Sequence, residues 1–116
     1  MSKHLSSVND LGFDVDVLAS ELPVLVEATA RWCGPCRAQQ PILERVAAQL
    51  AGRARIVLLD IEDAPLTATR LAIRGAPTLI VFARGREVTR HTGLAPETIV
   101  RRLLEPHLAA EARSPA

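Results

Sequence analysis

TARWCGPCRAQQP, residues 29–41, contains the only tryptophan and the only two cysteines of the 116-residue chain. A Gly-Pro pair separates Cys33 from Cys36, a buried strand is predicted just before them, and a helix is predicted just after. Cys33 is expected to be the first residue of that helix or its cap, where unpaired backbone N–H groups and the helix dipole favour a thiolate over a thiol. Arg37, one turn further on, adds positive charge. The segment therefore predicts a reactive sulfur at Cys33.

The spacing of the two cysteines suits thiol–disulfide exchange. With two residues between them, the sulfurs lie one helical turn apart and can close a small disulfide ring. Gly34 allows the close approach, and Pro35 limits the backbone conformations of the reduced form. In such an exchange Cys33 attacks a disulfide, a mixed disulfide forms, and Cys36 resolves it.

Three other interpretations of the cysteine pair remain open. A zinc site needs four ligands, and the only histidines, His4, His91 and His107, are widely scattered in the sequence. The cysteines can instead be small apolar side chains of a core. The pair can also persist in a domain that serves only as a binding module.

The totals of the chain limit the classes of function. Its 116 residues suffice for one domain, and 14 basic against 13 acidic residues give a net charge of +1. This balance offers no basic surface for nucleic acid or membrane lipid, and no apolar run approaches the ~18 residues that span a bilayer. Because the first residues also lack the apolar region of a secretory signal, we expect a cytoplasmic protein. In that reducing compartment two cysteines indicate chemistry or metal binding rather than a structural disulfide.

Hydrophobic patterning predicts an α/β fold. We expect strands at 24–28, 56–61, 78–83 and 87–92, helices at 33–50, 65–71 and from Pro96 onward, and a short edge strand near 4–6. Asp10 is expected to cap a first helix that carries Phe13, Val17 and Leu18. Pro41 should kink the long helix, and Arg84-Gly85 should form a hairpin turn. The order β-α-β followed by β-β-α predicts a central mixed β-sheet flanked by helices.

The sequence resembles the thioredoxin family. The resemblance rests on FDVDVL (13–18), LVEATARWCGPC (25–36), PILERVA (41–47), RGAPTLIVF (74–82), Gly85 and Gly93, in the family's order and spacing. It implies a single thioredoxin-fold domain over residues 1–116, with a core at about 8–108 and a frayed tail at 109–116.

The resemblance also implies roles for individual residues. Cys33 matches the nucleophile and Cys36 the resolving cysteine. Pro77 matches a cis-proline that faces the pair and turns the backbone of Ala76 towards the sulfurs, where it can pair with an incoming substrate strand. The expected docking surface for extended peptides consists of Trp32, Gly34, Pro35, Gly75, Ala76 and Gly93. A plain turn proline is the alternative for Pro77.

Glu27 is the one ionisable residue in the strand before the cysteines. Burial should raise its pKa, and a carboxyl behind the pair can take the proton of Cys36 as that thiol attacks the mixed disulfide. Alternatively, Glu27 turns outward or caps a backbone group.

The chain also departs from the family. Ala28 and Thr29 replace two aromatic residues, and we expect water to reach Glu27 and Cys36 more easily as a result. Leu58 replaces a lysine that commonly pairs with the buried acid, so Glu27 should remain protonated more readily. Ala38 and Gln39 replace bulkier apolar residues.

Together these observations predict a monomeric thiol–disulfide oxidoreductase that reduces protein disulfides in cell redox homeostasis. Its redox group is its own cysteine pair, with no bound cofactor or metal, and the resemblance implies electron transfer from a flavin- and NADPH-dependent thioredoxin reductase. An exchanger of the isomerase or oxidant type, suggested by Glu27, is one alternative. A non-catalytic interaction module is the other.

Overall fold

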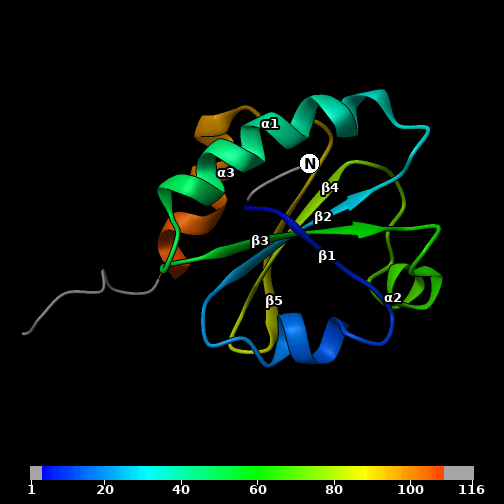
Figure 1. The fold of residues 1–116 in the computed structure, drawn as a ribbon, viewed down its shortest axis with the longest axis horizontal. Helices are drawn as coiled ribbons and strands as arrows, with labels where there is room; N and C mark the ends of the chain where they lie inside the picture. The colour runs from blue at the N-terminus through cyan, green and yellow to red at the C-terminus, as the bar shows by residue number, and fades with distance from the viewer. Residues whose placement is uncertain (1–3, 109–116) are drawn as a thin grey trace, which may run out of the picture.

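Five strands form one mixed sheet in the computed structural model, which describes residues 4–108 (Figure 1). Their order across the sheet is β1 (Ser6–Val8), β3 (Arg55–Asp60), β2 (Val24–Thr29), β4 (Thr78–Ala83) and β5 (Arg86–Thr92). β3 is parallel to both of its neighbours, whereas β4 is antiparallel to both of its own. The predicted α/β class with a central mixed sheet is confirmed.

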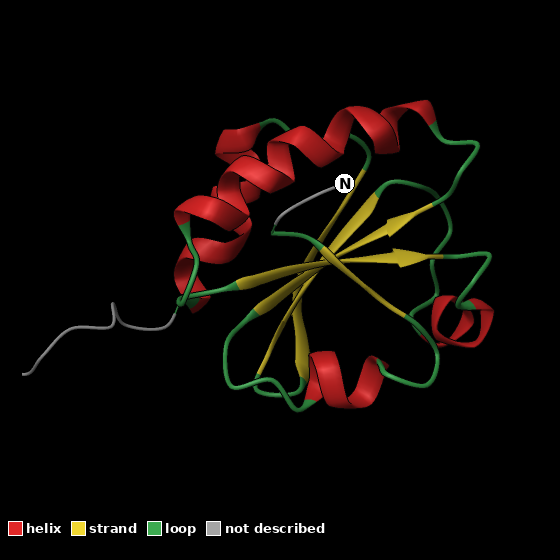
Figure 2. Ribbon diagram, in the orientation of Figure 1, coloured by secondary structure: helices red, strands yellow, loops and turns green. Residues whose placement is uncertain are grey.

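Helices cover both faces of this sheet (Figure 2). They are η1 (Asp14–Leu18), a short π-helical turn, then α1 (Gly34–Gln49), α2 (Pro65–Arg70), α3 (Glu97–Leu104) and the 3-10 turn η2 (Glu105–His107). The helices predicted at 33–50, at 65–71 and from Pro96 are found within one residue of their expected bounds, whereas the first helix, expected to begin after Asp10, is only the short turn η1 that begins at Asp14. α1 continues across Pro41.

Two apolar layers hold the helices to the sheet, because alternate residues of a strand point to opposite faces. On one face, Leu25, Leu79 and Val81 pack with Leu43, Val46, Val100 and Leu104 of α1 and α3. On the other face, Val24, Val26, Ile80 and Phe82 pack with Phe13 and Val17. The rings of Phe13 and Phe82 meet edge to face, with their centroids 5.5 Å apart. Glu27 follows Leu25 by two residues, so its side chain lies on the face that α1 covers.

The β4–β5 turn forms as its sequence predicts. Arg84 and Gly85 both have positive φ, 53° and 78°, which is the backbone conformation of a two-residue hairpin turn that matches strand twist.

The predicted role of Asp10 is wrong. η1 has no side-chain cap, and the Asp10 carboxylate instead accepts hydrogen bonds from the backbone N–H groups of Leu66 and Thr67 and from the Thr67 hydroxyl, at 3.3, 2.7 and 2.7 Å. It therefore caps the start of α2, whose own N-cap residue, Ala64, has no side-chain oxygen to do so. These hydrogen bonds lower the pKa of Asp10, with that from the Thr67 hydroxyl contributing most.

Candidate active site

Cys33 and Cys36 form a disulfide at the junction of β2 and α1, with their Cα atoms 5.3 Å apart. Cys33 is the N-cap residue of α1 and has an extended backbone. Its sulfur accepts a hydrogen bond from the backbone N–H of Cys36 at 3.1 Å. This is the contact that an N-cap oxygen usually makes, and here it directs a helix N–H at sulfur. The position therefore stabilises negative charge on Cys33 when the pair is reduced.

The two cysteine residues differ slightly in their access to solvent. Cys33 is 3% exposed and Cys36 is 0% exposed. An incoming group can therefore reach Cys33 first, while Cys36 is in a position to attack only Cys33.

The segment before β4 packs against the cysteine pair. Ala76 contacts the small apolar cluster that Cys33 and Cys36 form with Ala30. The Ala76–Pro77 peptide bond is cis. The Pro77 carbonyl accepts a hydrogen bond of 2.8 Å from the N–H of Gly93, whose φ of 96° favours glycine. The structure thus brings the cysteine, Pro77 and Gly93 segments together.

Exposed apolar surface borders these segments. Trp32 is 66% exposed, Gly34 and Pro35 are exposed, and Gly75, Ala76 and Gly93 are half-buried. Leu94 is 48% exposed and follows Gly93 directly. Leu94 is not among the residues predicted from the sequence, although its position as an apolar residue directly after a predicted surface glycine was a signal for it.

Glu27 is fully buried and, among the described residues, neither of its carboxylate oxygens has a hydrogen-bond partner. Its neighbours across the sheet are Leu58 of β3 and Leu79 of β4. Burial raises the pKa of Glu27 to about 8. The carboxyl therefore neither turns outward nor caps a backbone group, and it lies on the α1 side of the sheet with its protonated form favoured at neutral pH.

A family model for thioredoxin matches residues 4–105. The chain belongs to the thioredoxin family. It is 42% identical to the thioredoxin of Synechocystis sp. over 101 residues, which cover 87% of this chain and 94% of that protein. It is 38% identical to thioredoxin 1 of Nostoc sp. over 103 residues, covering 89% and 96% of the two chains. It is 45% identical to the thioredoxin of Acidithiobacillus ferridurans over 86 residues, covering 74% and 80%.

Membership of the thioredoxin family, together with the Cys33–Cys36 disulfide, makes this chain a thiol–disulfide oxidoreductase of the protein-disulfide reductase kind. Within residues 4–108, no group of three His, Cys, Asp or Glu side chains is placed to hold a metal ion. No helix in the same range has the length and apolar character needed to cross a membrane.

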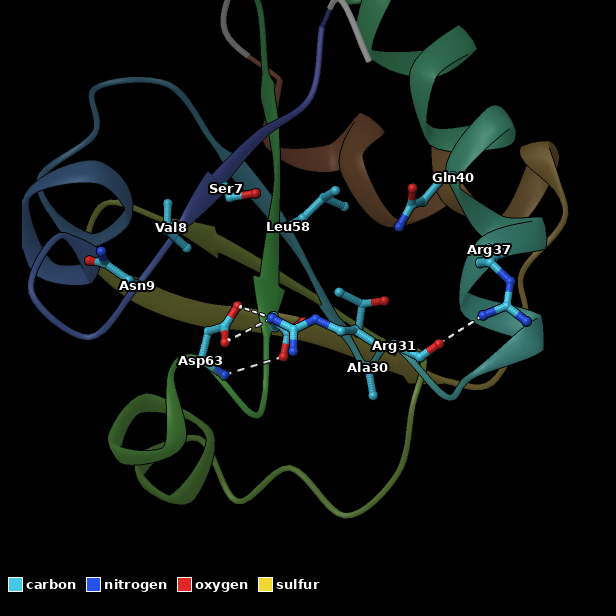
Figure 3. A pocket seen from close by; sticks show the side chains of 11 residues that line it. Ser7, Val8, Asn9, Ala30, Arg31, Arg37, Gln40, Leu58 and Asp63 are labelled. Atoms are coloured by element: carbon cyan, nitrogen blue, oxygen red, sulfur yellow. Dashed lines mark hydrogen bonds and ion pairs between the residues drawn. The ribbon is translucent and has the colours of Figure 1, made fainter. Parts of the chain in front are cut away.

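The replacement of two thioredoxin aromatics by Ala28 and Thr29 does not open the site to water as expected. Glu27 and Cys36 are both 0% exposed. A pocket of about 670 Å³ instead lies on the surface nearby, lined by Thr29 and Leu58 among others (Figure 3). The carboxyl of Glu27 therefore has no exposure to bulk solvent despite the small side chains at positions 28 and 29.

Charged groups border this pocket. Arg31 pairs with Asp63 at 3.1 Å and approaches Asp60 at 3.8 Å. Arg37 donates a hydrogen bond of 2.8 Å to the Arg31 carbonyl (Figure 3).

Gln39 is a second buried polar residue, and it is not among the site residues predicted from the sequence. Its side-chain amide donates to the Ala95 carbonyl at 2.9 Å and accepts from the Ala95 N–H at 2.7 Å. Gln39 and Ala95 are both 0% exposed. The sequence did contain a signal for it, because Gln39 is a polar residue on the apolar face of the predicted helix, one turn after Cys36.

Proposed function

We propose that this chain reduces disulfides of protein substrates, with Cys33 as the nucleophile and Cys36 as the resolving cysteine. The observation that carries the assignment is the position of Cys33, whose sulfur caps α1 and accepts the Cys36 N–H, and which is the more exposed residue of the pair. Cys36 follows three residues later in α1, is bonded to Cys33 through sulfur, and is fully buried.

The atoms and electrons of the exchange reaction balance without a further cofactor. The Cys33 thiolate attacks one sulfur of the substrate disulfide, and the other sulfur leaves as a thiolate. Cys36 then loses its proton and attacks the Cys33 sulfur, which releases the second substrate thiolate. Two electrons pass to the substrate, and the protein is left with the Cys33–Cys36 disulfide seen in the structure.

Glu27 is proposed to accept the proton of Cys36 during the second step. Its burial on the α1 side of the sheet and its pKa of about 8 support this role, because a general base works best with a pKa near the working pH, and the ionised fraction of the carboxyl accepts the proton. Among the described residues, no hydrogen bond holds either oxygen of this carboxyl in another task.

Substrate is proposed to dock as an extended peptide beside the disulfide, against Trp32, Gly34, Pro35, Gly75, Ala76 and Gly93, while Pro77 turns the backbone of Ala76 towards the sulfurs. The contact of Ala76 with the cysteine cluster and the hydrogen bond from Gly93 to Pro77 support this surface. We also propose that the chain acts as a monomer in the cytoplasm, where an NADPH-dependent thioredoxin reductase returns the pair to the dithiol.

A disulfide-reduction assay tests the proposal. With insulin as a model substrate, turnover is expected with dithiothreitol and then with NADPH and a thioredoxin reductase. Cys33→Ser should abolish turnover, whereas Cys36→Ser should accumulate a mixed disulfide. Absence of turnover with both donors would overturn the reductase assignment. Binding of a partner that survives both serine substitutions would favour an interaction module.

Stopped-flow traces test the role of Glu27. Glu27→Gln should slow resolution by Cys36 more than attack by Cys33, because only the resolving thiol has to lose its proton to the carboxyl. Equal slowing of the two steps would contradict that role.

A further inference from the structure

We infer that Gln39 is a positioning residue that fixes the Gly93–Ala95 loop beside the disulfide and thereby sets the affinity for protein substrates. The inference rests on the proposed function, and it deepens that function by assigning a determinant of substrate size. Gln39 is distinct from the cysteines, from Glu27 and from the Pro77 segment.

The Gln39 side-chain amide makes a pair of hydrogen bonds with the backbone of a single residue, as two residues of adjacent strands do. Its donor and its acceptor are both satisfied by the same residue, Ala95, at 2.9 and 2.7 Å. Both residues are fully buried. Two hydrogen bonds from one planar amide fix the orientation of the Ala95 backbone as well as its distance from α1.

The other end of the loop is fixed from the opposite direction. The Gly93 N–H donates to the Pro77 carbonyl at 2.8 Å, and Thr92 is the strand partner of Thr78. Leu94 lies between the two attachment points and is 48% exposed. The loop is thus held by the segment facing the disulfide at one end and by the active-site helix at the other.

Gln39 connects this loop to the cysteine pair itself. It follows Cys36 by three residues in α1, so the two side chains lie on the same face of the helix, one turn apart. The Pro77 segment, the loop and α1 are then joined in one linked set of contacts beside the disulfide, and the exposed Leu94 lies at its rim.

An apolar residue at position 39 would break this set. It would leave the N–H and the carbonyl of Ala95 buried without these partners, and such groups are costly to bury. The loop would then relax outward to hydrate them, which displaces Leu94. A protein substrate that contacts the rim would lose affinity, whereas a small disulfide that touches only Cys33 would not.

The test compares Gln39→Met, which conserves volume and removes both hydrogen bonds, with Gln40→Met. Gln40 is the adjacent, partly exposed glutamine and lines the pocket on the other side of α1. Gln39→Met should raise the KM for insulin about tenfold, equivalent to about 1.4 kcal/mol of binding, with kcat little changed. The second-order rate with dithionitrobenzoate should stay within about twofold of the wild type, as should both readouts for Gln40→Met.

Amide hydrogen exchange provides a readout that does not depend on activity. The Ala95 amide should exchange at least tenfold faster in Gln39→Met than in the wild type, while amides of β2 should not change. An unchanged KM for insulin, or equal losses with insulin and with dithionitrobenzoate, would overturn the inference. If the wild type reduces neither substrate, the proposed function fails. If the wild type is active but either of the two results above is found for Gln39→Met, only the role of Gln39 is overturned.

A second variant covers the case in which Gln39→Met does not fold. Leu94→Ser changes a half-exposed side chain on the same rim and leaves the buried amide pair intact. It should raise the KM for insulin and spare dithionitrobenzoate. An unchanged KM for insulin would mean that the loop does not contact protein substrates, and the inference would fall.

Discussion

Glu27 and Leu58 are direct partners in the parallel pair of β2 and β3. Leu79 of β4 flanks Glu27 on the other side, so the carboxyl lies between two aliphatic side chains. Charge on Glu27 is therefore disfavoured by desolvation, which raises its pKa to about 8. The same apolar environment lowers the stability of the folded protein when Glu27 is ionised, and it brings the pKa of the carboxyl close to the pH at which it would exchange a proton.

Glu27 should make the stability of the oxidised protein fall with rising pH. Its pKa is about 8 in the folded state against an ordinary 4.5, so between these values the folded state binds more protons than the unfolded state. The free energy of unfolding then decreases from about pH 4.5 to pH 8 and levels off above. Each pKa unit corresponds to about 1.4 kcal/mol, so the total fall is several kcal/mol.

Urea unfolding of the disulfide form at a series of pH values measures this slope. Glu27→Gln should gain stability relative to the wild type as pH rises through the window. Glu21→Gln, which removes an exposed carboxyl, is the control and should follow the wild type. A wild type and a Glu27→Gln variant with parallel pH profiles would falsify the assignment of the slope to Glu27.

Leu58→Lys should lower the pKa of Glu27. The substitution places an ammonium beside the carboxyl, and an opposite charge at close range favours the ionised form by about 1–3 pKa units. Carboxyl-carbon NMR titration of Glu27 measures the change, with Leu58→Met as the uncharged control. An unshifted titration would mean that the lysine turns into the neighbouring pocket towards Asp60 and that Leu58 does not control the acid.

Local patterns in the sequence were sufficient to predict the sheet, the helices and the cysteine pair. The apolar run around Glu27 marked a buried strand, and the repeat of apolar residues after Cys36 marked α1, because both signals arise within a few neighbouring residues. The contacts of Asp10 and Gln39 could not be predicted, because they are not local. Their hydrogen-bond partners lie 56 or 57 residues away in the chain, and no local pattern specifies which distant backbone groups a polar side chain will meet.

Asp10→Ala should destabilise the fold through α2. The substitution removes the acceptor for the Leu66 and Thr67 N–H groups and for the Thr67 hydroxyl, so Tm should fall by several degrees at pH 7, with Asp10→Asn intermediate. Because the Thr67 hydrogen bonds lower the pKa of Asp10 below its ordinary 3.8, the stabilisation is present above that pH and is lost as pH falls through the folded-state pKa. Thermal melting at pH 7 and at progressively lower pH measures both effects, with Asp16→Ala as the control on the same segment. A Tm difference that grows in acid would contradict the capping role.

Thr29→Trp should stabilise the protein by filling the pocket beside Leu58. Thr29 is only 9% exposed and lines a pocket of about 670 Å³, which has room for an indole ring. Burying a large apolar side chain contributes about 1.5–3 kcal/mol, so the urea midpoint of unfolding should rise. Thr29→Val, which removes the hydroxyl and adds no volume, is the control and should leave the midpoint nearly unchanged. A lower midpoint for Thr29→Trp would show that the ring displaces β1 or α1 instead of entering the pocket, and that the pocket is not a site left by a missing side chain.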